Sequence, residues 1–277
     1  MEVERVLGEG AWGRVVLRRL GETPCAVKEM VVQGERQSAL VQREFEMQRM
    51  VHDHPHVVRV HDLAIGPRSC CIYMEYAGSE TVLQMIQEGR LNERQRLAVL
   101  GQVASALVHI HSLDVAHMDV KAENIIVDDA SHLHVRLTDF GLACRTQDTV
   151  VACGTFGYCA PEVMLHARTV RPLKADSWSF GIFAVALFHG RMPFSVADAR
   201  ACPPFRRFAI HQHNCLTPSQ SIDASYDAPA FAWESTDKLV VDSCLHLDPR
   251  RRRDMAEVRS TIPSTNAVPK TCRRVSR

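Results

Sequence analysis

The sequence has little of what marks exported, membrane-spanning or nucleic-acid-binding proteins. Its 33 lysines and arginines balance 32 aspartates and glutamates, for a net charge of +1. We therefore expect no nucleic acid partner and no electrostatic attachment to a membrane. Residues 1–5 contain no apolar signal core and no arginine-rich amphipathic pattern. The longest stretch free of acidic and basic side chains, residues 97–113, includes Gln102 and His109 and is too polar to span a bilayer, so we expect a buried helix there.

The sequence also lacks a disulfide framework. Its ten cysteines have no regular spacing, and without a signal peptide the simplest interpretation is reduced thiols in an intracellular, most simply cytoplasmic, protein. With 46% hydrophobic residues in 277, the chain can bury the core of one large domain or of two modest lobes.

The most informative stretch is HMDVKAEN at residues 117–124, followed by DFG at 139–141. The Asp119 carboxylate can accept the proton of an attacking hydroxyl, and the Lys121 ammonium can neutralise charge on a moving phosphoryl group. The Asn124 amide oxygen and the Asp139 carboxylate are ligands that a hard cation such as Mg²⁺ prefers. If the two segments lie together, they form a phosphoryl-transfer site.

A glycine-rich stretch, LGEGAWGRV at residues 7–15, opens the chain. We expect a β-hairpin and a third strand over residues 1–30, with the second turn at 21–24. Glycines let backbone amides approach phosphate oxygens. A dinucleotide-binding fold uses a similar pattern but requires a helix directly afterwards. Here a strand continues, and the apolar strand CAVK ends at Lys28, which favours the phosphate-binding hairpin over an ordinary surface lysine.

Residues 35–51 are charged and favour a helix, and histidines 52, 54, 56 and 61 follow it. Pro55 and the flanking valines indicate a helix-to-strand connection there in preference to a metal site. Apolar residues from 97 to 110 recur at helical spacing and predict a core helix. Residues 195–235 read as loops with short helices and a turn at Cys202-Pro203, and 239–247 as an apolar helical face.

With GTFGYCAPE at 154–162 and DSWSFG at 176–181, the chain resembles a eukaryotic-type serine/threonine protein kinase over residues 1–262. The resemblance implies an α+β, bilobal protein-kinase fold. A small β-rich N-lobe with one main helix would cover 1–74, a hinge 75–78, and a larger, mostly helical C-lobe 79–262. We expect 263–277 to form a disordered basic tail.

The resemblance also implies the ATP site. Backbone groups of Glu75 and Ala77 would bind the adenine edge, with Met74 behind the pocket. Glu80 either reaches the ribose or is an exposed glutamate at a helix start. The expected cofactor-binding residues are Leu7, Gly8, Glu9, Gly10, Gly13, Val15, Ala26, Lys28, Glu75, Ala77, Glu80 and Ile126.

Further roles are implied around this site. Lys28 would pair with a helical glutamate, for which Glu44 is favoured and Glu46 competes. Glu162 would pair with Arg252, and Asp176 would brace the catalytic loop. Lys121 and Thr155 are the family's marks for serine and threonine substrates. The expected catalytic residues are thus Asp119, Lys121, Lys28, Glu44 and Thr155, and the metal ligands Asn124 and Asp139.

These features predict ATP- and Mg²⁺-dependent phosphorylation of protein serine or threonine, with ATP and protein substrates as partners and no prediction of oligomeric state. A catalytically silent pseudokinase is the alternative, and residues 160–162 disfavour a small-molecule kinase. Residues 43–45, 54–58 and 151–155 resemble the kinase subfamily named for an SH3-binding domain, although no proline-rich SH3 ligand is present.

One residue departs from the family pattern. Met118 stands where arginine usually precedes the catalytic aspartate and helps to hold an activating phosphate. Methionine cannot bind phosphate. We therefore hypothesise that activity does not depend on phosphorylation of Thr146, Thr149 or Thr155.

Overall fold

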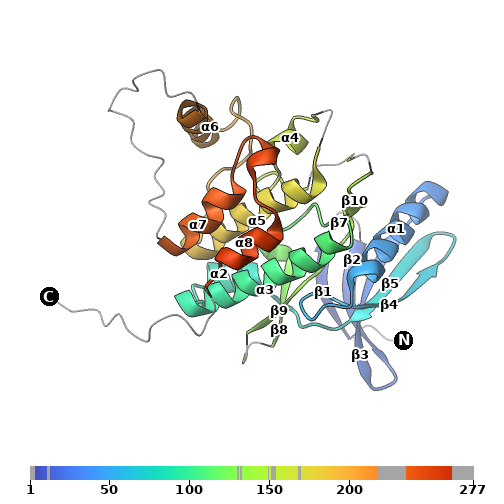
Figure 1. The fold of residues 1–277 in the computed structure, drawn as a ribbon. Coiled ribbons are helices and arrows are strands. Elements are labelled where there is room, and N and C mark those ends of the chain that lie inside the picture. Colours follow the sequence, from blue (N-terminus) through green and yellow to red (C-terminus); the bar gives the residue numbers. More distant parts are fainter. Residues whose placement is uncertain are drawn as a thin grey trace.

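The computed structural model describes residues 4–10, 13–129, 131, 133–148, 150, 154–167, 170–216 and 235–263. A small β-sheet part and a larger helical part lie side by side (Figure 1). The predicted α+β, bilobal architecture is therefore confirmed. The predicted tail lies outside the described residues from 264 onward.

The small part is a five-stranded antiparallel sheet in the order β1-β2-β3-β5-β4. Its strands are β1 Arg5–Gly10, β2 Gly13–Leu20, β3 Thr23–Val31, β4 Val60–Ile65 and β5 Ser69–Glu75. The expected hairpin and third strand are thus present. The helix α1, Glu35–Val51, lies beside β4 and β5 (Figure 1) and buries Val41, Met47 and Val51, which follow helical spacing.

The helical part surrounds two long helices. In α3, Glu93–Ser112, the predicted apolar stripe is buried from Leu97 to Ile110. The helix α5, Pro172–His189, is buried on all sides along nearly its whole length, as a central core helix must be. The remaining helices are α2 Val82–Gln87, η1 Ala122–Asn124, α4 Pro161–Met164, α6 Pro203–Leu216, α7 Ser235–Cys244, η2 Pro249–Arg251 and α8 Met255–Thr261.

Short strands carry the catalytic segments between the helices. They are β6 Glu80–Thr81, β7 Val115–Ala116, β8 Ile125–Asp129, β9 His134–Leu137 and β10 Cys144–Arg145. Strand β9 also bonds the connection after α1, because Leu137 donates to His56 O and accepts from Val58 N at 2.9 Å each. This connection fastens α1 to the helical part.

Two sequence expectations need correction in the helical part. A turn was predicted at Cys202-Pro203, but α6 begins at Pro203, because proline at the first helical position loses no helical hydrogen bond. The predicted helical face over 239–247 belongs to α7, which begins earlier and ends at Cys244. No described helix is both long and apolar enough to cross a membrane.

The cysteines follow the sequence expectation only in part. Free thiols are found at residues 25, 70, 71, 144, 202 and 244. Cys159 is disulfide-bonded, contrary to the expectation of reduced thiols throughout.

Candidate active site

The catalytic loop between β7 and η1 is held by one buried carboxylate. Asp176 of α5 accepts hydrogen bonds from the backbone N–H groups of His117 at 2.7 Å and Met118 at 2.8 Å. His111 Nε2 lies 2.9 Å from the same carboxylate. Met118 has a φ of 66°, a conformation that non-glycine residues rarely adopt. The Asp176 bonds thus stabilise a strained backbone directly before Asp119, as the family resemblance implied for this residue.

Asp119 lies at the centre of a network of donors. Its Oδ1 accepts from the Thr155 N–H and the Thr155 hydroxyl, both at 3.0 Å. Its Oδ2 lies 2.7 Å from Lys121 Nζ and 3.1 Å from Asn124 Nδ2. Lys121 also donates to Thr155 Oγ1 at 2.7 Å. The structure therefore brings three of the predicted residues together around the carboxylate of Asp119, a residue that is 8% exposed.

Gly154 allows the activation segment to approach this carboxylate. A Cβ at Gly154 would lie 2.7 Å from both Asp119 Oδ1 and the Met118 carbonyl oxygen, a distance that real Cβ atoms essentially never show. Thr155 can bond Asp119 only because the preceding residue is glycine.

A second cluster joins the sheet to the helical part. Lys28 Nζ of β3 lies 2.6 Å from Glu44 Oε1 of α1 and 2.9 Å from Asp139 Oδ1. The exposed fractions of the three side chains are 13%, 8% and 44%, so the aspartate is the accessible member. Of the two glutamates considered, Glu44 is the one that meets the lysine, and Glu46 is exposed.

The charges in this cluster stabilise one another. Burial alone would lower the pKa of Lys28, but Glu44 and Asp139 raise it. Burial would raise the pKa of Asp139, yet the Lys28 ammonium holds it below its usual value. Burial raises the pKa of Glu44, and Lys28 offsets only part of this effect. Lys28 is therefore cationic and Asp139 anionic at neutral pH.

Asp139 and Asn124 offer oxygens suited to a divalent cation. Asp139 has a φ of 65°, and the next residue, Phe140, is buried against His117 with ring centroids 4.7 Å apart. Asn124 uses its amide nitrogen to bond Asp119, and no described residue donates to its Oδ1 or to Asp139 Oδ2. These two oxygens fit a hard cation.

The residues predicted to enclose a base lie in one apolar cluster. Ala26, Met74 and Ala77 are buried in it, and the side chains that pack on them include Leu7, Val15 and Ile126. Among the described residues, no hydrogen bond uses the backbone of Ala77, although this residue is only 3% exposed. The backbone of Ala77 is therefore open to a polar partner from outside the described chain.

The glycine-rich hairpin lies over this cluster. Gly8, Glu9 and Gly10 belong to β1, and Gly10 pairs with Gly13 of β2. Gly13 has a φ of 134°, and a Cβ there would lie 2.1 Å from the Glu29 carbonyl oxygen, so glycine is required. No described atom beyond the chain neighbours lies within 4 Å of a Cβ at Gly8 or Gly10, which leaves room for phosphate beside them.

Two predicted residues use their side chains elsewhere. The Glu75 carboxylate accepts from Arg136 at 2.7 Å and from the Arg59 N–H at 2.6 Å, so only its backbone can serve a base. Both carboxylate oxygens of Glu80 bond Arg90. Glu80 was expected either to reach the ribose or to be an exposed glutamate at a helix start. In the structure its carboxylate is paired with Arg90.

Sequence reasoning did not find one contact that bears on the site. Arg43, the residue before Glu44, donates to Asp148 Oδ2 at 2.8 Å, which links α1 to the segment after β10. No motif marks Asp148, since the pairing depends on how the two segments meet. The predicted Glu162–Arg252 pair forms with two hydrogen bonds, at 2.6 and 2.7 Å.

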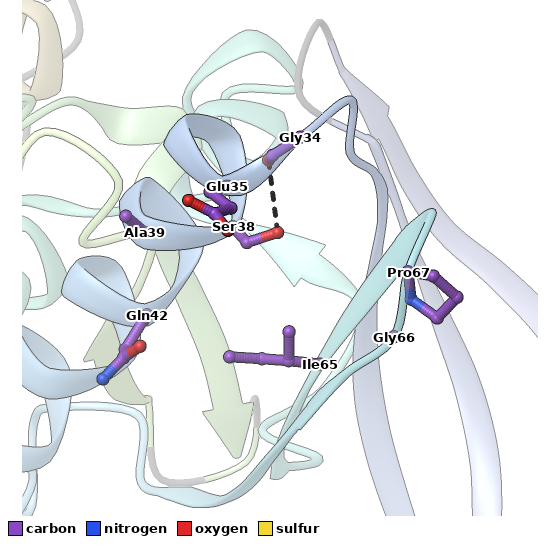
Figure 2. Close-up of a pocket in the computed structure, with 8 residues that line it drawn as sticks. All are labelled: Gly34, Glu35, Ser38, Ala39, Gln42, Ile65, Gly66 and Pro67. Carbon is purple, nitrogen blue, oxygen red and sulfur yellow. Dashed lines mark hydrogen bonds between the residues drawn. The ribbon is translucent and has the colours of Figure 1, made fainter.

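A surface hollow of about 400 Å³ lies beside the first turns of α1 (Figure 2). Its lining comes from α1 and from the β4–β5 turn, including Ser38 and Ile65, and contains none of the candidate residues. It is separate from the site described above.

Comparison with known proteins agrees with this geometry. Residues 1–261 match the family model described as protein kinase domain. CBL-interacting serine/threonine-protein kinase 24 from Arabidopsis thaliana is 31% identical over 236 residues, which cover 76% of this chain and 52% of that protein. NUAK family SNF1-like kinase 1 from Homo sapiens is 30% identical over 206 residues, covering 71% of this chain and 31% of that protein.

A third relative is the carbon catabolite-derepressing protein kinase of Saccharomyces cerevisiae, 29% identical over 202 residues that cover 70% of this chain and 31% of that protein. The chain thus spans about half the length of the first of these relatives, at 52%, and less of the other two. Because the family model covers nearly the whole chain, the chain belongs to the protein kinase domain family.

Proposed function

We propose that this protein transfers the γ-phosphoryl group of ATP to serine or threonine hydroxyls of protein substrates. The observation that carries the proposal is the donor network around Asp119, together with the Lys28–Glu44–Asp139 cluster. Phosphoryl transfer requires mainly positioning and electrostatic stabilisation, and these two clusters supply both. Relatives whose names describe serine/threonine kinases support the substrate class.

Asp119 is the proposed catalytic base, which orients the substrate hydroxyl and accepts its proton. Lys121, held by Asp119 and Thr155, is placed to neutralise charge on the phosphoryl group. A lysine and a hydroxyl in this arrangement suit a short aliphatic alcohol and leave less room for a phenol. Lys28, fixed by Glu44, is the proposed ligand of the α- and β-phosphates.

Nucleotide and metal have separate protein contacts in this proposal. The backbone of Glu75 and Ala77 binds the adenine edge, and Leu7, Val15, Ala26 and Ile126 pack on its faces. The glycine-rich hairpin covers the phosphates. Mg²⁺ is the proposed cation at Asn124 and Asp139, where it would neutralise phosphate charge.

We further propose the boundaries 1–74 for the N-lobe, 75–78 for the hinge and 79–262 for the C-lobe. The end of β5 at Glu75 and the start of β6 at Glu80 support the position of the hinge. We also propose an intracellular, cytoplasmic location. The support is that six of the described cysteines are free thiols, with Cys159 as the disulfide-bonded exception.

The competing function is a catalytically silent module that binds nucleotide or partners. Loss of one catalytic group is the usual sign of silence, whereas Lys28, Asp119, Asn124 and Asp139 are all present. Radiolabelled ATP with a generic protein substrate, such as myelin basic protein or casein, separates the two functions.

We expect label in serine and threonine for the wild type, and a loss of about 10³-fold or more with Asp119→Asn, since the base is replaced by a near-isosteric amide. Thermal unfolding of both proteins verifies that the substitution leaves the fold intact. Equal labelling by the two proteins, or none by the wild type, would reject the proposed function.

A further inference from the structure

Four histidines outside the active site lie in contact where α1 is joined to the helical part. His54 and His56 belong to the connection after α1, His109 to α3 and His134 to β9. The ring centroids are 4.9 Å apart for His54 and His109, 5.5 Å for His54 and His56, and 4.7 Å for His56 and His134. Imidazole is the side chain whose ordinary pKa lies closest to neutral pH, so a row of imidazoles in contact can respond to mild acid.

Hydrogen bonds hold the His54 ring in its neutral form. Its Nδ1 accepts the His56 N–H at 3.2 Å, and its Nε2 lies 3.2 Å from the Ser105 hydroxyl oxygen. A ring nitrogen that accepts a hydrogen bond carries no proton of its own. A second proton on His54 would sit on Nδ1, against the His56 N–H, and would break this bond.

The groups that face His54 disfavour its charged form. Burial, and then the charges of His109 and His56, lower the pKa of His54 from 6.5 to about 4. The neighbouring acid in the sequence, Asp53, has a side chain that is 76% exposed and bonds Arg59 at 3.0 Å. The docked connection therefore resists protonation, whereas a connection released into water would take up the proton near the ordinary pKa of histidine, about 6.5.

The surroundings of His56 act in the same direction. Burial lowers its pKa, a hydrogen bond to a backbone carbonyl offsets part of this effect, and the charges of His134, Arg136 and Arg259 lower it further. Asp128 of β8 lies 3.1 Å from His134 Nδ1, but Arg136 also bonds this carboxylate, at 2.8 Å. The groups that reach His56 from β9 and α8 thus oppose additional positive charge in the cluster.

The cluster also holds the helix that carries Glu44. His109 Nε2 donates to the carbonyl oxygen of Val51, the last residue of α1, at 3.1 Å. Glu44 lies about two helical turns before Val51 and bonds Lys28 at 2.6 Å. Because a helix of this length moves as one body, release of its C-terminal end displaces Glu44 from the lysine.

We propose that α1 is held by a pH-sensitive contact, in which protonation of His54 releases the connection from α3 and separates Glu44 from Lys28. This regulation rests on the proposed function, in which Lys28 binds the phosphates of ATP. One proton taken up on release lowers the ratio of docked to released protein by about tenfold per pH unit below about pH 6.5. Acid therefore weakens the binding of nucleotide.

Hydrogen exchange of α1 measures its release directly and needs no catalysis. After correction for the intrinsic exchange rate, protection of residues 35–51 in the wild type should fall about tenfold from pH 7.5 to pH 5.5, as one proton taken up on release requires. In His54→Gln, whose neutral side chain takes up no proton, the fall should stay within about twofold. His61→Gln, a matched control at an exposed position of β4, should behave as the wild type.

Kinetics test the effect on the active site. Over the same pH range, kcat/KM for ATP should fall about two- to tenfold more in the wild type than in His54→Gln, mainly through KM. At pH 7.5 the two proteins should agree within about twofold, because His54 is neutral there. His54→Asn provides a second neutral variant, and thermal unfolding verifies that each variant is folded.

The two measurements separate this proposal from the proposed function. A protein that transfers no phosphate, yet loses α1 protection in acid through His54, retains the pH-sensitive contact and loses the function. Equal pH dependence of protection in the wild type and in both neutral variants overturns the proposal, and so do superimposable pH profiles of kcat/KM.

Discussion

Glu44 and Glu46 stand two positions apart on α1 and have opposite environments. Glu44 is buried and lies 2.6 Å from Lys28, while Glu46 is exposed and accepts a hydrogen bond from Gln42. The sequence left both open as partners of the lysine, because residues two apart on a helix point in different directions and only the docking of α1 decides between them.

The two glutamates make a matched pair of variants. Glu44→Gln should lower kcat/KM for ATP by about 10- to 100-fold, since a charge-assisted bond to a buried lysine is lost and Lys28 is no longer held toward the phosphates. Glu46→Gln should leave kcat/KM for ATP within about twofold of the wild-type value, because Glu46 is exposed. Steady-state kinetics with varied ATP measures both, and equal effects of the two variants would contradict the assignment.

At the scale of elements, α1 is fixed from two directions. The connection after it is bonded to β9, and Arg43 reaches Asp148, which also accepts the Arg145 N–H at 2.9 Å. The Asp148 carboxylate thus links α1 to the segment after β10. The contact agrees with the hypothesis, based on Met118, that this segment needs no phosphate.

Asp148→Asn should lower kcat by about two- to fivefold, because a partly exposed ion pair contributes about 1 kcal/mol or less. Arg43→Gln should have a similar effect, and the double variant should be no worse than either single one, since both remove the same contact. Phosphatase treatment of the wild type should leave the rate unchanged. Additive losses, or a large loss after phosphatase, would show that another group orders the segment.

His54, in the connection that follows α1, packs against helix α3. His54 stacks on His109 of α3, with ring centroids 4.9 Å apart, and lies 3.2 Å from Ser105 Oγ. Burial, followed by the charges of His109 and His56, lowers the pKa of His54 from 6.5 to about 4. The neutral imidazole is therefore the form that the folded protein accommodates.

This shift predicts a pH dependence of stability. Between pH 6.5 and about 4 the unfolded chain binds the proton and folded His54 does not, so stability falls as pH falls through this window. In His54→Gln the loss between pH 7 and pH 5 should be smaller than in the wild type. Urea unfolding at the two pH values measures the difference, and parallel losses in both proteins would contradict the assignment.

At the scale of the whole molecule, the proposed nucleotide contacts come from both the sheet and the helical part. Lys28 Nζ lies in the sheet and Asp139 Oδ1 in the helical part, 2.9 Å apart. A ligand that binds at this junction stabilises both parts together, because it binds only the folded chain.

ATP with Mg²⁺ at about 100 times Kd should therefore stabilise the protein by about 2.7 kcal/mol. Differential scanning fluorimetry should show this as a rise in Tm of a few degrees. Lys28→Met should remove most of the rise, whereas Glu46→Gln, on the exposed face of α1, should keep it. A Lys28→Met protein with the full rise would place the nucleotide elsewhere.

The sequence alone determined the fold class, the order of the first strands and the core helix over residues 97–110, because apolar periodicity and turn residues act locally. It also singled out Lys28, Asp119, Asn124 and Asp139 as candidate site residues, since their chemistry is tied to short motifs of fixed spacing. It predicted a turn at Cys202-Pro203, where α6 begins, and a helical face over 239–247 that differs from the bounds of α7, because proline and a weak apolar pattern allow more than one local structure.

Only the tertiary structure decided which charged side chains are paired with a partner in the chain and which are not. It joined Glu44 to Lys28, Arg43 to Asp148 and Arg90 to Glu80, and it left Glu123 Oε2 without a hydrogen-bond partner among the described residues. Some of these partners, such as Arg43 and Asp148, are distant in the sequence. Others, such as Glu44, have a chemically equivalent residue close by in the sequence. The free energy of such pairs depends on distance and burial, which the folded chain alone defines.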